Sequence, residues 1–274
     1  MILRTDSYRN LEEDIATVFD SIEMYIYEQI CEFDKRWIVA NGPGSDWDAF
    51  YEEIDNFIDE NADLEMIDEV YVYHLSRLFL KEEQLVPLKQ LLVNNSNLSC
   101  FLRKYDIYFV DGSDGNIEFY YKNKLITPEM ILSSGHHNLL AKRLGYLGEA
   151  DFCVNGFAFW PDIQNTSDGY FNDIKRSPEI IRSLDYFLGT DMWRMFQKET
   201  QFYGVVFKVP IENVIFDEKD LLLDKEEKVK IILRYALRTM HGCYYRCASS
   251  GNNPILRLDD GETVKIDHFI EIED

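Results

Sequence analysis

Apolar residues near the N-terminus recur every three or four positions, which predicts two amphipathic helices. The first stripe runs over residues 11–30 with the 3.6-residue period of a helix that buries one side. Residues 41–44, Asn-Gly-Pro-Gly, interrupt the pattern because glycine and proline both end helices. Ser45 is then the expected cap of a second helix, with apolar residues from Trp47 to Ile58 on one face. Both helices need another surface on which to bury these stripes.

After residue 69 the pattern changes to short runs of β-branched and aromatic residues, which predict strands. These runs cover residues 70–75, 107–110, 117–121, 152–160, 203–209, 255–258 and 263–272. Turn residues at 111–116 predict a hairpin between the second and third runs. A second hairpin is expected at the C-terminus around residues 259–261.

Helices are expected between these strands. The predicted helices cover residues 82–92, a segment after Thr127, residues 178–188, a segment after Thr190 and residues 225–240. Strands and helices are mixed without regular βαβ alternation, which favours an α+β fold over a doubly wound sheet. We expect mixed, mostly antiparallel sheets with surrounding helices at residues 70–274, preceded by an acidic helical segment at residues 1–69.

The charge of the chain is concentrated in this first segment. The formal net charge is −22, and residues 1–69 carry 20 acidic and only 4 basic residues. Such a field repels phosphate backbones and does not favour broad nucleic-acid binding. The acidic segment is either a solvated surface or a module that docks on a basic partner, mimics nucleic acid or covers a basic groove of its own chain.

The composition also indicates the compartment. No apolar run reaches the roughly 18–20 residues of a membrane span, and the first residues lack the apolar stretch of a signal peptide. The five cysteines are odd in number and mostly scattered, as expected for reduced thiols. We therefore expect a cytoplasmic protein without membrane partners.

Several common catalytic motifs are absent from the sequence. It has no Walker loop, no Gly-x-Gly-x-x-Gly after a strand and no Gly-x-Ser-x-Gly elbow. His241, Cys243 and Cys247 match a zinc site only weakly, because no second cysteine pair completes it. His136 and His137 are adjacent, so their side chains project in different directions. No metal site is predicted, and no spaced motif supports a metal-dependent hydrolase.

His74 and Arg77 form the more informative pair, at the end of the first predicted strand. A histidine there can hydrogen-bond a ribose hydroxyl or an amide, and an arginine can bind a phosphate as a permanent, forked cation. The alternative is a core histidine beside an arginine that pairs with local acids.

Together with the aromatic strand at residues 154–159 and the C-terminal hairpin, these residues resemble the layout of NAD-dependent ADP-ribosyltransferases. The resemblance is closest to the toxin-like branch found in bacterial and phage conflict, and it covers about residues 70–274. It implies an enzyme that uses NAD as a substrate and transfers ADP-ribose to a macromolecular acceptor. It also implies that His74 and Arg77 contact the NAD ribose or phosphate.

The resemblance further implies an aromatic side chain against the nicotinamide and a glutamate near the last strands. Phe157, Phe159 and Tyr170 are the candidates for stacking. The glutamate stabilises positive charge at the anomeric carbon as nicotinamide leaves. Since the residues entering the last predicted hairpin contain no acid, Glu262 at its turn is the nearest candidate for the catalytic group.

The alternative is a different class of function. The acidic N-terminal segment is also typical of an interaction module, such as an inhibitor or immunity-type partner of a basic protein. Association driven by such a field should be sensitive to salt.

Overall fold

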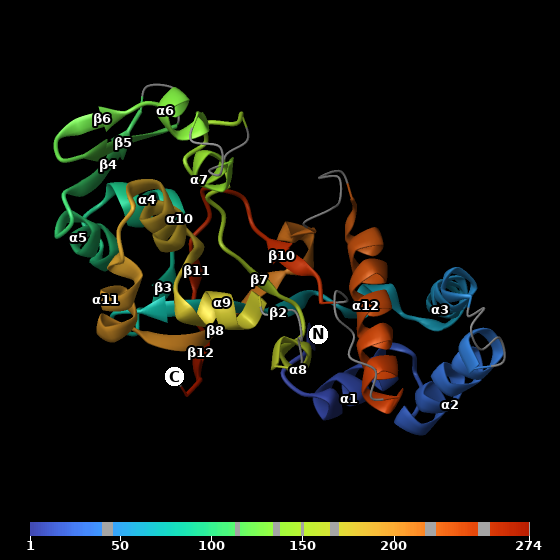
Figure 1. Ribbon diagram of the computed structural model, residues 1–274. Helices are drawn as coiled ribbons and strands as arrows, with labels where there is room; N and C mark the ends of the chain where they lie inside the picture. The colour runs from blue at the N-terminus through green and yellow to red at the C-terminus, as the bar shows by residue number, and fades with distance from the viewer. Residues whose placement is uncertain are drawn as a thin grey trace. The chain divides into compact units, whose positions relative to one another are not determined.

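The computed structural model describes residues 1–39, 46–112, 116–133, 138–148, 151–164, 170–216, 223–245 and 253–273 (Figure 1). The chain divides into two compact units. Unit 1 comprises Met1–Tyr73, Gly156–Gly169 and Lys208–Arg257, and unit 2 comprises His74–Asn155, Tyr170–Phe207 and Leu258–Asp274. Unit 1 thus contains the acidic N-terminal segment together with two later parts of the chain. The domain boundary at residue 69 stays a prediction.

Four helices form the larger part of unit 1. They are α1 (Tyr8–Val18), α2 (Glu23–Asp34), α3 (Trp47–Asn61) and α12 (Lys225–Tyr245). Helix α12 contacts all three N-terminal helices and provides the surface that their apolar stripes require (Figure 1). Ion pairs add to this packing, because Arg234 Nη2 lies 2.7 Å from Asp55 Oδ2 and Lys230 Nζ lies 3.0 Å from Asp59 Oδ1. Part of the acidic surface is therefore neutralised by basic residues of its own chain.

The single helix predicted over residues 11–30 is wrong, since the structure has two helices there. Asp20, between α1 and α2, has a φ of 44°, a left-handed conformation that a continuous helix does not contain. Ser21 N donates to Ala16 O at 2.9 Å and so closes the end of α1. No glycine or proline marks this break, and the apolar period continues across it.

The second predicted helix is confirmed as α3. Its cap is Asp46, whose Oδ1 accepts a hydrogen bond from Ala49 N at 3.0 Å. Phe50 and Ile54 are fully buried as the stripe predicts, whereas Trp47 is 42% exposed. Ser45 and residues 41–44 lie outside the described residues.

The largest sheet has the strand order β12-β8-β2-β7-β10-β9, with β1 beside β2. Its strands are β1 (Ile2–Leu3), β2 (Glu69–Leu78), β7 (Asn155–Phe157), β8 (Gln201–Pro210), β9 (Ile215–Phe216), β10 (Ile255–Arg257) and β12 (His268–Glu271). Strands β2 and β7 are antiparallel with Tyr73 opposite Phe157. The strand predicted over residues 152–160 is limited to β7, and α8 (Trp160–Gln164) follows it.

The C-terminal hairpin is a second correction. The predicted turn exists, with Glu262 N donating to Asp259 O at 3.0 Å, but the strands beside it do not pair with each other. Strand β10 pairs with β9, β11 (Val264–Lys265) pairs with β3 (Gln84–Leu85), and β12 pairs with β8. The turn residues determine only where the chain reverses direction. The strands on either side of the turn pair with strands that are distant in sequence. One of the features on which the family resemblance rests is therefore absent.

Unit 2 contains a separate antiparallel sheet. Strands β4 (Ile107–Asp111) and β5 (Ile117–Tyr121) confirm the predicted hairpin, and β6 (Lys124–Ile126) pairs with β5. The tip of the hairpin, residues 113–115, lies outside the described residues. The helices of unit 2 are α4 (Leu88–Val93), α5 (Asn97–Arg103), α6 (Pro128–Leu132), α7 (Asn138–Arg143), α9 (Tyr170–Arg176), α10 (Glu179–Leu188) and α11 (Met192–Glu199). A buried apolar cluster that includes Phe101, Phe119 and Phe196 joins these elements.

Local signals mark some of these helix ends. Thr127 Oγ1 accepts from Met130 N at the start of α6, and α10 ends at Gly189 with a φ of 67°. The predicted helix over residues 82–92 is wrong in its first half, where β3 precedes Pro87 and only α4 is helical. Helices combined with mostly antiparallel strands confirm the predicted α+β fold. None of the described helices has the length and apolar character needed to cross a membrane.

Candidate functional site

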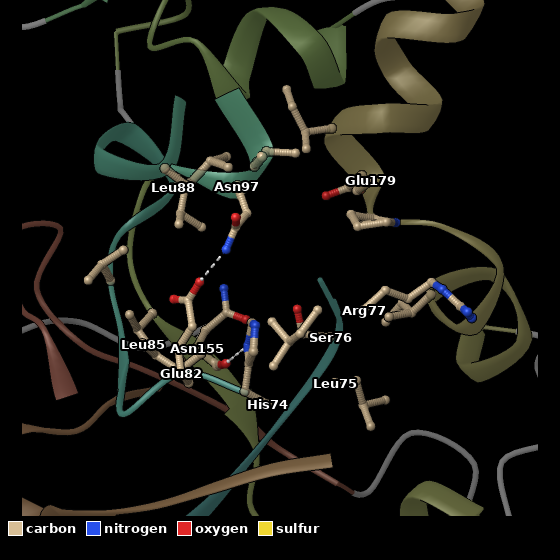
Figure 2. Close-up of a pocket in the computed structure, with 18 of the residues that line it drawn as sticks. His74, Leu75, Ser76, Arg77, Glu82, Leu85, Leu88, Asn97, Asn155 and Glu179 are labelled. Carbon is tan, nitrogen blue, oxygen red and sulfur yellow. Dashed lines mark hydrogen bonds between the residues drawn. The ribbon is translucent and has the colours of Figure 1, made fainter. Parts of the chain in front are cut away.

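His74 lines a cavity of about 240 Å³ in unit 2 (Figure 2). Its walls are largely apolar, with Leu75, Leu85, Leu88, Leu98, Ile180 and Phe196 among the lining residues. A few polar side chains lie between them. This combination is typical of small-molecule sites, although the volume lies below the roughly 300–1,000 Å³ of drug-sized pockets. The cavity as it stands fits a small ligand or one end of a larger one.

His74 is held in one orientation by the neighbouring chain. Its Nδ1 lies 2.6 Å from the carbonyl oxygen of Asn155. Because a carbonyl oxygen can only accept, Nδ1 carries the proton and Nε2 keeps a lone pair. No described residue hydrogen-bonds Nε2, and His74 lines the cavity. The ring therefore offers a hydrogen-bond acceptor to a ligand.

The environment keeps this imidazole neutral. Burial lowers the pKa of His74 below its ordinary value of 6.5. The hydrogen bond to Asn155 opposes this shift, and the nearby charge of Arg143 adds to it. A neutral histidine with a free Nε2 can accept a proton at physiological pH.

Arg77 is placed differently from His74. Its side chain is buried, and its guanidinium points away from the cavity (Figure 2). Nη1 donates to Lys175 O at 2.7 Å, Nη2 donates to Gln197 O and Thr200 O at 3.1 and 2.9 Å, and Nε donates to Thr200 Oγ1 at 3.1 Å. The guanidinium thus links β2 to backbone of α9 and α11. This arrangement is that of a structural arginine and argues against a role as a phosphate ligand.

A second arginine, Arg143, lies on the cavity wall and is also occupied. Its Nε and Nη2 donate to Glu179 Oε2 at 2.9 and 2.6 Å. Its Nη1 contacts Asp151, with 2.9 Å to Oδ2 and 3.1 Å to the carbonyl oxygen. Glu179 and Asp151 thereby compensate the positive charge beside His74.

Carboxylates lie on two sides of the cavity. Glu179 directs its side chain into the cavity from the start of α10, while Glu82 lies across from it (Figure 2). Asn97 Nδ2 donates to Glu82 Oε1 at 3.2 Å.

The other predicted site residues do not line this cavity. Phe157 is partly buried and Phe159 fully buried, and both belong to unit 1. Glu262 is partly buried after the turn at Asp259 and is not among the described cavity residues. The side chain of Tyr170 lies outside the described residues. The roles assigned to these four residues stay predictions.

Four residues of the cavity were not expected at a site from the sequence: Glu82, Arg143, Asn155 and Glu179. Glu179 follows Ser177-Pro178 in a pattern typical of a helix start, and this pattern does not indicate a binding site. Asn155 acts through its carbonyl oxygen, which any residue would provide. Arg143 has no local signal.

The histidine of the weak zinc motif has another partner. His241 Nε2 lies 2.7 Å from Asp34 Oδ1, and both side chains are buried in unit 1. Cys247, His136 and His137 lie outside the described residues. Within the described part of the chain, no group of three or more histidines, cysteines or carboxylates is placed to hold a metal ion.

Comparisons with known proteins leave the chain without an assigned family. No family model matches it, and no solved structure matches it. A curated relative is an uncharacterized protein, ORF116, of Acidianus filamentous virus 2 (isolate Italy/Pozzuoli), which is 33% identical over 63 residues. The match covers 22% of this chain and 52% of the viral protein, so the chain spans about half the length of that relative. This similarity adds no activity to the site described above.

Proposed function

We propose that unit 2 binds a small organic molecule in the cavity at His74 and that His74 accepts a proton or a hydrogen bond from it. The observation that carries this proposal is the hydrogen bond from Nδ1 to Asn155 O, which leaves Nε2 free toward an apolar-walled cavity. The lowered pKa of His74 supports it, because the lone pair is then available at neutral pH.

The tautomer of His74 provides a direct test. Nitrogen-15 NMR of the imidazole should show a neutral ring with the proton on Nδ1 at neutral pH. A His74→Gln variant assigns the signal, and His268→Gln, at an exposed histidine, is the control. A protonated ring at neutral pH, or a proton on Nε2, would contradict the proposed role.

ADP-ribosyl transfer from NAD is the reaction that the family resemblance suggests for this site. His74 supports it by its place in a cavity that fits one end of a larger ligand, whereas Arg77 does not, because backbone carbonyls occupy its guanidinium. Incubation with NAD and cell extract should release nicotinamide and label a macromolecular acceptor, and Glu262→Gln should lower the rate. Absence of both nicotinamide and label would exclude this reaction and leave the binding proposal intact.

A second candidate function rests on a surface of unit 1. Ile22, Met24 and Tyr25 are 66%, 59% and 39% exposed at the start of α2. Glu23 and Glu28 accompany them in a unit with 29 acidic and 13 basic residues, a net charge of −16. Exposed apolar side chains among carboxylates suit a basic partner with apolar residues at its centre. We propose that unit 1 is the acidic interaction module and that its basic partner binds at this surface of α2.

Pull-down experiments can test this second function with matched baits. A specific partner should be basic, should be retained at low salt and should be lost at high salt. It should also be lost with Met24→Ser, whereas Leu80→Ser changes a similarly exposed apolar residue of unit 2 and should retain the partner. Partners that bind both variants equally would exclude the α2 surface.

A further inference from the structure

Some polar side chains of the His74 cavity already have hydrogen-bond partners within the protein, and others do not. Both arginines of the lining are occupied: Arg77 by backbone carbonyls and Thr200, and Arg143 by Glu179 and Asp151. An anionic ligand would therefore have to displace existing partners from either guanidinium. Such displacement leaves buried acceptors unpaired and is costly.

Three unused groups in the cavity can only accept hydrogen bonds, whereas the side chains of Ser76 and Gln84, which also line it, can both donate and accept. His74 Nε2 has no partner among the described residues. Glu179 uses Oε2 for Arg143, and Glu82 uses Oε1 for Asn97, so each retains an oxygen that no described residue hydrogen-bonds. Three acceptors thus line the same largely apolar cavity, and a ligand can supply donors to them.

The net charge of unit 2 acts in the same direction, while Arg143 places one positive charge near His74. Unit 2 contains 21 acidic and 15 basic residues, a net charge of −6. Glu82 is exposed at the cavity and Glu179 is 31% exposed, so a cation can approach them through solvent. A field of this sign raises the local concentration of cations.

We propose that the ligand of this cavity is a small organic cation or amine with an apolar body, bound by Glu179, Glu82 and His74, and that it carries no phosphate or carboxylate in the cavity. This inference rests on the proposed binding function and defines its substrate class. Glu179 and Glu82 accept hydrogen bonds from the ammonium group, His74 Nε2 accepts a further one, and the leucines contact the apolar body.

Three probes with the same aromatic ring can test the charge preference: benzylammonium, benzyl alcohol and benzoate. Each is titrated into nitrogen-15-labelled protein while the His74 ring signals are followed. Benzylammonium should bind about tenfold more tightly than benzyl alcohol, as expected for a partly desolvated ion pair. Benzoate should bind more weakly than the alcohol.

Variants connect this preference to the carboxylates. Glu179→Gln keeps an acceptor for Arg143 and should reduce the benzylammonium affinity to within about twofold of the alcohol. Glu82→Gln should reduce it in the same direction. Glu83→Gln removes the same charge at the adjacent residue, which does not line the cavity, and should retain the tenfold preference. Thermal melts of all variants report whether the fold is retained.

The outcomes separate this inference from the binding proposal. Equal binding of the three probes at His74, or a preference for benzoate, overturns the cation selectivity and leaves a small-molecule site. A benzylammonium preference that survives both Glu179→Gln and Glu82→Gln also overturns it. If no probe perturbs His74 at millimolar concentrations, both the inference and the binding proposal fail.

Discussion

His74 and Arg77 stand three positions apart in β2, and this spacing places their side chains on opposite faces of the strand. Successive side chains of a strand point to opposite faces, so two residues lie on the same face only when they are an even number of positions apart. The structure shows this alternation from His74 onward: His74 and Ser76 are partly exposed, whereas Leu75 and Arg77 are buried. The predicted strand does contain His74, but the alternation of side chains places Arg77 on the opposite face of that strand.

The buried position of Arg77 leads to a prediction for stability. Arg77→Met leaves the carbonyls of Lys175, Gln197 and Thr200 without their donor. We expect a loss of about 2–4 kcal/mol in the free energy of unfolding, measured by urea denaturation. Arg103→Met, at an exposed arginine that donates to Asn95 Oδ1, should change it by no more than about 0.5 kcal/mol. A nearly neutral Arg77→Met would mean that this guanidinium serves a ligand instead.

His74 makes the free energy of unfolding depend on pH. Its folded pKa lies below the unfolded value of 6.5, so the unfolded chain binds a proton that the folded chain does not. The stability from this residue is complete above pH 6.5 and is lost as the pH falls below that value toward the folded pKa. The wild-type protein should therefore lose more stability on acidification than His74→Gln does. Denaturation curves at several pH values measure this difference, and equal losses in both proteins would contradict it.

At the scale of the element, β7 depends on one glycine. A Cβ at Gly156 would lie 2.7 Å from the carbonyl carbon and oxygen of Tyr73 and 2.8 Å from Val72 Cγ1. Backbone atoms of β2 cannot move aside without loss of pairing, so Gly156→Ala should destabilise the protein by about 1–3 kcal/mol. Gly261→Ala, where a Cβ meets no atom within 4 Å, is the matched control. Urea denaturation of both variants should show a shift for Gly156→Ala alone, and similar midpoints would contradict the close approach.

Elements specified by residues adjacent in sequence were predicted correctly, whereas features that depend on distant parts of the chain were not. The starts of α6 and α10 and the hairpin of β4 and β5 depend on residues adjacent in sequence, and all three are confirmed. The break at Asp20 and the pairing of β10, β11 and β12 depend on conformations and partners that no adjacent residue specifies. The same limit applies to the site: His74 was identified in a strand, whereas Arg143 and Glu179 reach the cavity only through the tertiary fold.

At the scale of the whole molecule, the acidic residues outnumber the cations available to pair with them. Lys230 and Arg234 of α12 neutralise Asp59 and Asp55, but unit 1 retains a net charge of −16. Repulsion among the remaining carboxylates destabilises the compact state and is screened by salt. Exposed ion pairs contribute little and are screened as well. The repulsive part should therefore dominate the response of the protein to ionic strength.

We expect the melting temperature to rise by a few degrees as sodium chloride increases from about 0.01 M to about 0.15 M. Glu52→Gln removes an exposed charge of α3 and should raise the melting temperature at low salt while reducing the response to salt. Glu83→Gln, at an exposed residue of unit 2, should change both less, because that unit has a net charge of only −6. A melting temperature that falls with salt would show that ion pairs such as Arg234–Asp55 outweigh the repulsion. The acidic surface would then stabilise the fold of unit 1, with less of it available for a basic partner.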